Sequence, residues 1–251
     1  MNGRGDAAQG AKTKKMEEEM YRYLLFDADG TLFDFDSVET WAFDTTCREI
    51  GVEPTLDRLQ DYKEANRQVW KEFEQNAIDL DSLQTERFAR FFLAQGIVAD
   101  PFKTGRRFAD HLSHAGQLYP ETIPLLEELR DRGYRLSLIT NGISNVQHGR
   151  LDSSKTKQYF DVICISEEIG VQKPRKEFFD KFFNLANLGQ SDKQRCLVIG
   201  DSLSSDILGG NNAGIDTCWY NPSGKPKDPD IRPTYEIELL QELLALLPPL
   251  E

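Results

Sequence analysis

The sequence has little cysteine, little positive charge and no long apolar run. Its four cysteines are far apart, with no Cys-x-x-Cys pair. Three of them, Cys164, Cys196 and Cys218, lie in apolar runs typical of strands, which indicates buried free thiols in a reducing compartment. The sequence contains no run of 18 apolar residues, the length needed to span a membrane. Its N-terminus also lacks the apolar segment of a secretory signal. We therefore expect a cytoplasmic protein that does not contact membranes.

The shortage of positive charge also limits the partners. Thirty Lys and Arg residues stand against 42 Asp and Glu, a net charge of −12 over 251 residues. Such a chain repels a phosphate backbone, and no stripe of Lys or Arg offsets the repulsion, so we expect no nucleic-acid partner. One local positive site could still bind a small phosphorylated molecule. The sequence leaves the oligomeric state open.

Apolar runs alternate with helical patterns along most of the chain. The hydrophobic content of 39% is that of a globular protein. Strands separated by helices of 10–15 residues predict βαβ units, which means a Rossmann-like parallel sheet with helices on both faces, an α/β fold. The expected strands cover residues 21–26, 134–139, 162–165, 196–199 and 217–220. The expected helices cover 121–132, 144–153, 175–188 and 203–212, with a loop over 221–233 and a last helix over 235–247.

One segment, residues 37–117, breaks this alternation because its apolar residues recur only at helical spacing. We predict an inserted all-α domain there, with a helix near 57–75 and a second one opened by Asp81 and Gln84. An insertion after the first strand would lie over the carboxyl edge of the sheet, where such sheets bind ligands. The predicted organisation is a tail over 1–20, a core over 21–36 and 118–251, and a helical cap over 37–117.

Polar side chains follow the predicted strands. In a parallel sheet these strand ends meet at one edge, so several carboxylates, a hydroxyl and an ammonium group would converge there. Clustered carboxylates need a cation, and Mg²⁺ suits a site that also takes a phosphate. Ser144 and Gln147 are interpreted as a capping box of the next helix and are left out of the site. The residues concerned are Asp27, Asp29, Thr140, Asn141, Lys173, Asp201 and Asp206.

These residues occur in four segments that, in order, resemble the motifs of the haloacid dehalogenase-like (HAD) hydrolases. The segments are Asp27–Leu32, Thr140–Gly142, Lys173-Pro174 and Gly200–Asp206. The helical insertion lies where that superfamily has its C1-type cap, and the resemblance extends from about residue 21 to the last helix. Ser166–Pro174 and the residues around Asp201 are closer still to the YjjG/YfnB-type group of pyrimidine 5′-nucleotidases. The resemblance implies hydrolysis of nucleoside 5′-monophosphates, with a leaning toward pyrimidines.

The resemblance also implies a role for each residue. Asp27 is the nucleophile, and Asp29 is the general acid and base. Thr140, Asn141 and Lys173 bind the substrate phosphate. The carboxylates of Asp27 and Asp201 hold Mg²⁺ together with the backbone carbonyl of Asp29, while Asp206 orients Lys173 or a metal-bound water.

The motifs leave other functions open. A phosphomutase has the same catalytic residues, and a broad phosphatase acting on sugar phosphates or flavin mononucleotide would look the same. A phospho-acceptor module also combines Asp, Thr, Lys and Mg²⁺, but Asp29 beside the nucleophile favours turnover. A dehalogenase needs neither Asp29 nor a metal. On the cap, Tyr62, Asn66 and Trp70 form one stripe that could contact a base, although Tyr62 and Trp70 fit a cap core better.

Overall fold

The computed structural model describes residues 20–250; the predicted tail therefore lies outside the described residues except for Met20. Six parallel strands form one sheet in the order β3-β2-β1-β4-β5-β6. This confirms the predicted α/β class and places β1 between β2 and β4. The strands are β1 (Tyr23–Phe26), β2 (Arg135–Thr140), β3 (Val162–Ile165), β4 (Cys196–Gly200), β5 (Asp216–Tyr220) and β6 (Tyr235–Ile237).

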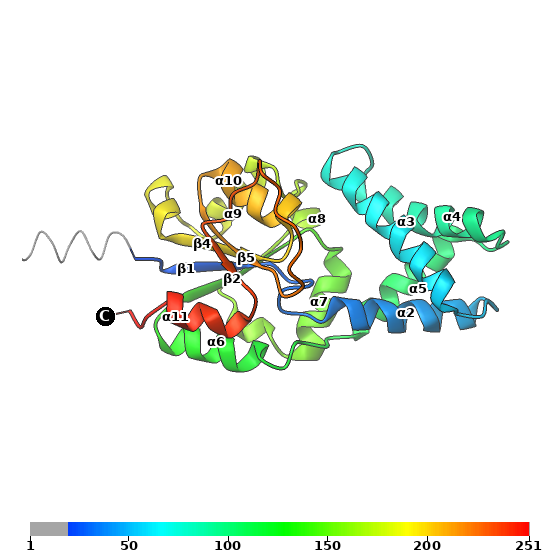
Figure 1. Ribbon diagram of the computed structural model, residues 1–251, viewed down its shortest axis with the longest axis horizontal. Coiled ribbons are helices and arrows are strands. Elements are labelled where there is room, and N and C mark those ends of the chain that lie inside the picture. Colours follow the sequence, from blue (N-terminus) through cyan, green and yellow to red (C-terminus); the bar gives the residue numbers. More distant parts are fainter. Residues whose placement is uncertain (1–19, 251) are drawn as a thin grey trace, which may run out of the picture.

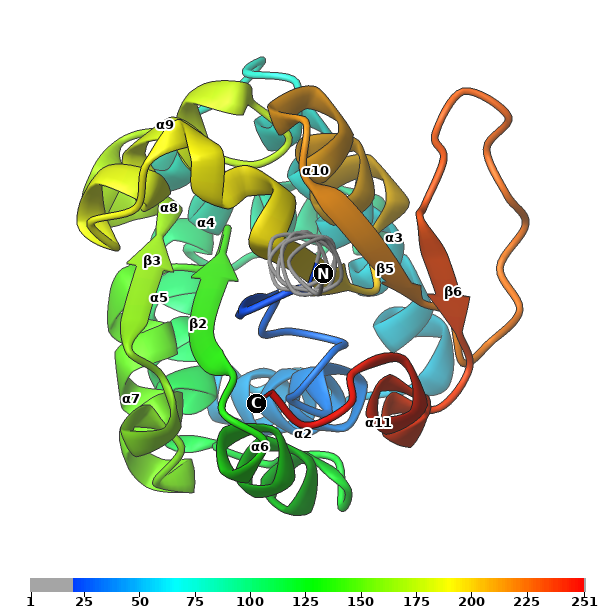
Figure 2. The same ribbon diagram turned by 90° about the vertical axis from the view of Figure 1, so that its left-hand side faces the viewer.

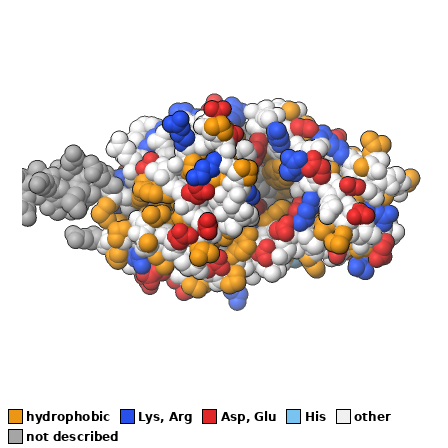
Figure 3. Space-filling model, in the orientation of Figure 1, with side chains coloured by type: hydrophobic (Ala, Val, Ile, Leu, Met, Phe, Trp, Pro, Cys, Tyr) orange, Lys and Arg blue, Asp and Glu red, His pale blue; other side chains and the backbone are white. Residues whose placement is uncertain are grey.

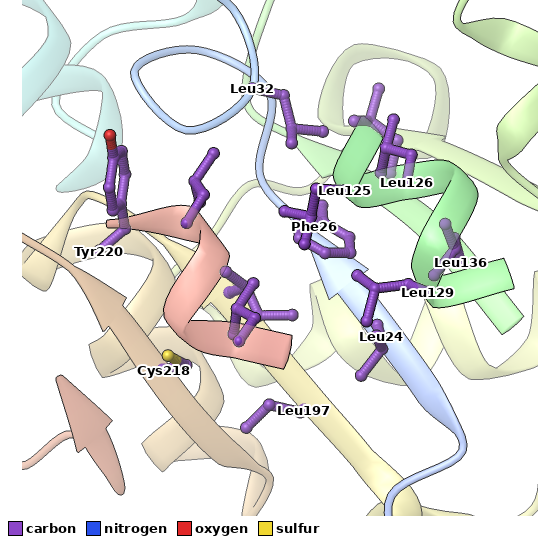
Figure 4. Packing of buried hydrophobic residues seen from close by; sticks show 14 of the residues in the cluster. Leu24, Phe26, Leu32, Leu125, Leu126, Leu129, Leu136, Leu197, Cys218 and Tyr220 are labelled. Atoms are coloured by element: carbon purple, nitrogen blue, oxygen red, sulfur yellow. The ribbon is translucent and has the colours of Figure 1, made fainter. Parts of the chain in front are cut away.

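The sheet is buried on both faces because successive side chains of a strand point to opposite sides. In β1, Leu24 and Phe26 pack on one face, against Leu125 of α6, and Figure 4 shows this cluster. Leu25 points to the other face and joins Phe178 of α9. Figure 2 shows α9 and α10 on one side of the sheet and α6 and α11 on the other. The helices and short turns of this part are α6 (Thr122–Asp131), α7 (Ser144–Ser154), α8 (Ser166–Ile169), α9 (Lys176–Leu185), a π-helical turn (Leu203–Ile207), α10 (Leu208–Ala213) and α11 (Leu243–Leu246).

The segment between β1 and α6 is helical and forms a second lobe at one end of the molecule (Figure 1). Its helices are α2 (Phe35–Glu49), α3 (Leu56–Glu74), α4 (Leu80–Gln95) and α5 (Pro101–His114). Aromatic rings fill its interior, with Tyr62 stacked on Phe43 at a centroid distance of 4.9 Å. The same cluster includes Ile143 and Val146 at the start of α7, so the helical lobe packs on the core through that helix.

Two helix starts differ from the sequence prediction. Helix α4 begins one residue before Asp81, and its N-cap is Asp79, whose carboxylate accepts from the backbone N–H of Ser82. The predicted capping box at the start of α7 is wrong as well, because the cap position is Ile143, which has no side-chain bond. The Ser144 hydroxyl instead donates to Glu168 at 2.6 Å.

The C-terminal part contains a strand where we predicted the start of a helix. Residues Tyr235–Ile237 pair with β5, and between them and residue 250 only α11 and a preceding 3-10 turn are helical. A run of three residues is too short to show an alternating pattern, and pairing with the free edge of β5 outweighs its local preference. Among residues 20–250, no helix is both long and apolar enough to cross a bilayer.

Candidate active site

The predicted site residues lie together at the carboxyl edge of the sheet. Asp27 follows β1, Thr140 ends β2 and Asp201 follows β4, and these three strands are neighbours. All three residues line a cavity of about 220 Å³ between the sheet and the helical lobe. The space-filling view shows the surface hollowed between the two lobes (Figure 3). A molecule held at the strand ends would therefore also contact the helical lobe.

Lys173 is the centre of the polar network. Its side chain is buried, and its ammonium group donates to Asp27 Oδ1 at 2.7 Å and to Asp206 Oδ1 at 2.6 Å. A third bond, of 2.8 Å, goes to the backbone carbonyl of Ile139. Three acceptors match the three protons of the ammonium group, so Lys173 is held in one position beside Asp27.

Asn141, in the loop after β2, binds the backbone of Lys173. The amide oxygen of Asn141 accepts from the N–H of Lys173 at 2.8 Å, and its amide nitrogen donates to the Lys173 carbonyl at 2.9 Å. The Asn141 side chain is thus occupied, which leaves the backbone of this loop for the predicted phosphate contact. The hydroxyl of Thr140 accepts from the N–H of Gly142 at 3.0 Å.

The site has more negative than positive charge. Burial, reinforced by repulsion from Asp206, raises the pKa of Asp27 well above its usual range, although Lys173 opposes the shift. Burial also raises the pKa of Asp201, against the pull of Lys225, whose ammonium group is 3.0 Å from Asp201 Oδ2. Burial alone would lower the pKa of Lys173, but the carboxylates of Asp206 and Asp27 raise it. The Lys173 ammonium is therefore charged, and an added cation would favour the ionised carboxylates.

The donor set fits a hard divalent cation. Carboxylate oxygens of Asp27, Asp201 and Asp206 lie within 4.8 Å of one another. Gly30 has a φ of +81°, and a Cβ there would lie 3.0 Å from the Asp201 carboxylate. A residue without a side chain therefore keeps the turn after Asp29 close to Asp201. Clustered carboxylate oxygens are the ligands that Mg²⁺ prefers.

Asp29 is bound by two side chains that the sequence analysis did not assign to the site. Gln147 Nε2 donates to Asp29 Oδ2 at 2.7 Å, and Arg150 Nη1 donates to Asp29 Oδ1. Both come from α7 and are buried. Gln147 was interpreted as a capping residue, and the capping interpretation is wrong because the side chain turns toward the site. The sequence did contain a signal for this role: the two residues are three positions apart, and so lie on one face of a helix that directly follows the Thr140 motif.

The helical lobe contributes a second set of polar side chains to the cavity. Asn66 and Arg87 are buried and line it, and Asn66 Nδ2 donates to Glu39 at 2.7 Å. Trp70 also lines the cavity, whereas Tyr62 lies in the aromatic interior of the lobe. Arg67, on the same helix as Asn66, is exposed and pairs with Glu64.

Comparison with known proteins identifies the family. The model of the haloacid dehalogenase-like hydrolases matches residues 24–220. The chain belongs to this family. Pyrimidine 5′-nucleotidase PynA of Streptococcus pneumoniae is 39% identical over 90% of this chain and 95% of its own. Pyrimidine 5′-nucleotidase YjjG of Escherichia coli is 36% identical over 90% of this chain and 97% of its own. The resemblance stated from the motifs is thereby confirmed.

A solved structure supports the same assignment. The magnesium-bound HAD-hydrolase YfnB of Bacillus subtilis has a TM-score of 0.85 and 37% identity. The match covers 91% of this chain and 99% of that one. The protein is thus a hydrolase of the HAD family, of the phosphomonoesterase type.

Proposed function

We propose that this HAD phosphatase hydrolyses nucleoside 5′-monophosphates, preferably those of pyrimidines, in a Mg²⁺-dependent reaction through an aspartyl-phosphate on Asp27. The observation that carries the chemistry is the buried Lys173, bonded to Asp27 and Asp206 beside Asp201. The relatives named as pyrimidine 5′-nucleotidases support the choice of substrate.

In the first step, an Asp27 carboxylate oxygen attacks phosphorus and the bond from phosphorus to the nucleoside 5′-oxygen breaks. Asp29 gives its proton to the leaving oxygen, so the nucleoside departs as an alcohol. Lys173 stabilises the negative charge on the transferring group, with Thr140 and the backbone N–H of Asn141 as further donors. Mg²⁺ would be held by Asp27, Asp201 and the Asp29 carbonyl, and it would shield the phosphate charge from the attacking carboxylate.

In the second step, water attacks the phosphorus of the aspartyl-phosphate. Asp29, now a carboxylate, takes the proton from this water. The bond between phosphorus and Asp27 breaks, which regenerates the Asp27 carboxylate and releases inorganic phosphate. Asp206, whose Oδ1 is 2.6 Å from the Lys173 ammonium, would hold that group in place.

The nucleoside would lie against the helical lobe, since the cavity extends from Asp27 to Asn66 and Arg87. Trp70 offers a flat apolar surface to a base, and Asn66 offers an amide to its polar edge. Asn66 Oδ1 and the Nε and Nη2 atoms of Arg87 have no hydrogen-bond partner within residues 20–250. Buried polar groups of this kind favour a ligand that completes their bonds.

The test is release of inorganic phosphate from a panel of substrates, with Mg²⁺ and with EDTA. The panel includes UMP, dUMP, TMP, CMP, AMP, GMP, sugar phosphates and flavin mononucleotide. Asp27→Asn is the blank, and we expect it to lose all measurable turnover while it keeps the fold. EDTA-sensitive release, highest for pyrimidine nucleotides, is the expected result. Preferred release from sugar phosphates would contradict the substrate, and release from Asp27→Asn would contradict the nucleophile.

A further inference from the structure

Two side chains of helix α7, neither of them part of the four motifs, bind both carboxylate oxygens of Asp29. Gln147 donates to one oxygen and Arg150 to the other. The two residues are three positions apart, so they lie on the same face of the helix. The exposed fraction of the Asp29 side chain is 27%, so without these bonds it could turn toward water.

Arg150 is placed for this one contact. Its side chain is fully buried, and Asp29 is its only ion-pair partner among the described residues. The guanidinium lies over the Phe33 ring, 4.4 Å from the centroid, while Nε and Nη2 are unpaired within the described part of the chain. An unpaired buried cation is strongly destabilising. Arg150 and Asp29 are therefore a matched pair, and the contact to Phe33 fixes the guanidinium plane.

Gln147 reaches Asp29 only because the residue at position 142 has no side chain. A Cβ on Gly142 would lie 2.2 Å from Gln147 Nε2 and 2.8 Å from its Cγ and Cδ. The Gly142 position therefore provides the space through which the Gln147 amide approaches Asp29. The third residue of the Thr140 motif thus has a physical role in placing Asp29, although it does not contact Asp29 itself.

We propose that Gln147 and Arg150 are positioning residues that hold Asp29 for proton transfer in both steps of the reaction. This inference rests on the role of Asp29 in the proposed function. In the first step the Asp29 proton goes to the leaving oxygen as the phosphorus–oxygen bond breaks. In the second step a proton of the attacking water goes to Asp29. Proton transfer needs the heavy atoms about 2.6–3.2 Å apart, so a carboxylate free to rotate would lose much of its effect.

The dependence on the leaving group separates positioning from a general structural role. The nucleoside alkoxide needs a proton to leave, whereas nitrophenolate leaves p-nitrophenyl phosphate without one. For Gln147→Met we expect kcat with UMP to fall about 10- to 100-fold with little change in KM, since misplacement by about 1 Å can cost about 100-fold. The first-turnover burst of nitrophenolate should keep its rate, while the steady state that follows it slows because water attack still needs Asp29.

Three further variants complete the experiment. Gly142→Ala displaces the Gln147 amide and should reproduce the Gln147→Met pattern. Arg150→Met should do the same, provided that its circular dichroism spectrum matches the wild type. His148→Gln is the matched control, because His148 lies on the same helix and bonds Glu168 rather than Asp29. Its kcat should stay within about twofold of the wild type.

The decisive comparison adds Gln147→Met to an enzyme that already has Asp29→Asn. There, Gln147→Met should cause no further loss of kcat, since effects that act through one group do not add. A burst slowed as much as UMP turnover, or an equal loss in the Asp29→Asn background, would overturn the proposal. If another alkyl phosphate proves to be the preferred substrate, it replaces UMP in the same comparison. If Asp29→Asn itself keeps full turnover, the proposed general-acid mechanism fails instead.

Discussion

The two walls of the cavity differ in which of their polar groups have hydrogen-bond partners. On the sheet side, the Lys173 ammonium has three acceptors, and both oxygens of Asp29 accept hydrogen bonds. The unpaired atoms on that side, Gln147 Oε1 and the Nε and Nη2 atoms of Arg150, belong to the side chains that hold Asp29. On the side of the helical lobe, Asn66 Oδ1 and two nitrogens of Arg87 are unpaired within residues 20–250. The groups proposed to react are therefore preorganised by the protein alone, whereas the polar groups of the lobe that face the cavity have hydrogen-bonding capacity left for a ligand.

This difference separates reaction chemistry from substrate choice. Groups that must stabilise a transition state gain from being fixed beforehand, because no reorganisation is then needed during the reaction. Groups that choose a substrate gain when an incorrect ligand leaves them unpaired, since the unpaired state is unfavourable. Changes on the sheet side should therefore reduce turnover of every substrate, and changes on the lobe side should alter the ranking of substrates.

The largest effect should come from Lys173→Met, which removes the only side-chain donor to Asp27 Oδ1 recorded within residues 20–250. We expect kcat to fall about 1,000-fold for all substrates, because the ammonium group proposed to stabilise the charge of the transferring phosphoryl group is lost. The free energy of unfolding, measured with urea, should fall by about 3–5 kcal/mol, since Asp27 and Asp206 remain buried without their cation.

Lys225→Met is the matched control for this change. Lys225 also pairs with an aspartate of the site, Asp201, but its side chain is 52% exposed. An exposed ion pair contributes less than about 1 kcal/mol, so this variant should retain most of its stability. Equal loss of stability in the two variants would contradict the view that burial makes Lys173 indispensable.

A smaller and more selective effect should follow from Asn66→Ala. We expect kcat/KM for the preferred nucleotide to fall about tenfold, as for loss of one hydrogen bond, while the nitrophenolate burst stays the same. Arg67→Met, on the same helix but exposed, is the control and should change neither value. A uniform decrease for all substrates would show that Asn66 supports the fold of the lobe rather than the ranking of substrates.

The residues at the strand ends could be predicted because two independent signals coincide there. An apolar run fixes where a buried strand ends, and the parallel topology then brings Asp27, Thr140 and Asp201 to one edge. Lys173 was found from its motif. Its three bonds could not be predicted, because they depend on how the loop after β3 packs beneath Asn141.

Gln147 and Arg150 were missed for a physical reason. A polar residue on a helix usually faces solvent, and a Ser followed three residues later by Gln is also the pattern of a capping box. The structure shows that α7 packs between the sheet and the helical lobe, and that Gln147 and Arg150 are therefore buried. The sequence alone does not show this. Strand β6 was missed since three residues carry no periodic signal, and its pairing with β5 depends on how the loop between the two strands folds back.

A predicted effect on stability rather than on turnover concerns Glu39, the partner of Asn66 in the helical lobe. Burial raises the pKa of Glu39 to about 7, although Lys63 and Arg87 oppose the shift. The folded state therefore holds the proton more tightly than the unfolded state. The stability that this group contributes is present below about pH 4.5 and is lost as the pH rises through about 7.

Glu39→Gln removes this titration while it keeps the shape of the side chain and one oxygen for Asn66. The difference in unfolding free energy between variant and wild type should move in favour of the variant from pH 5 to pH 8, by on the order of 2 kcal/mol. Urea unfolding at both pH values measures it, with the exposed Glu64→Gln as control. A difference independent of pH would mean that Glu39 is ionised to the same extent in both states. The Asn66 amide would then face a fixed charge throughout this range, rather than a partner that is partly protonated near neutral pH.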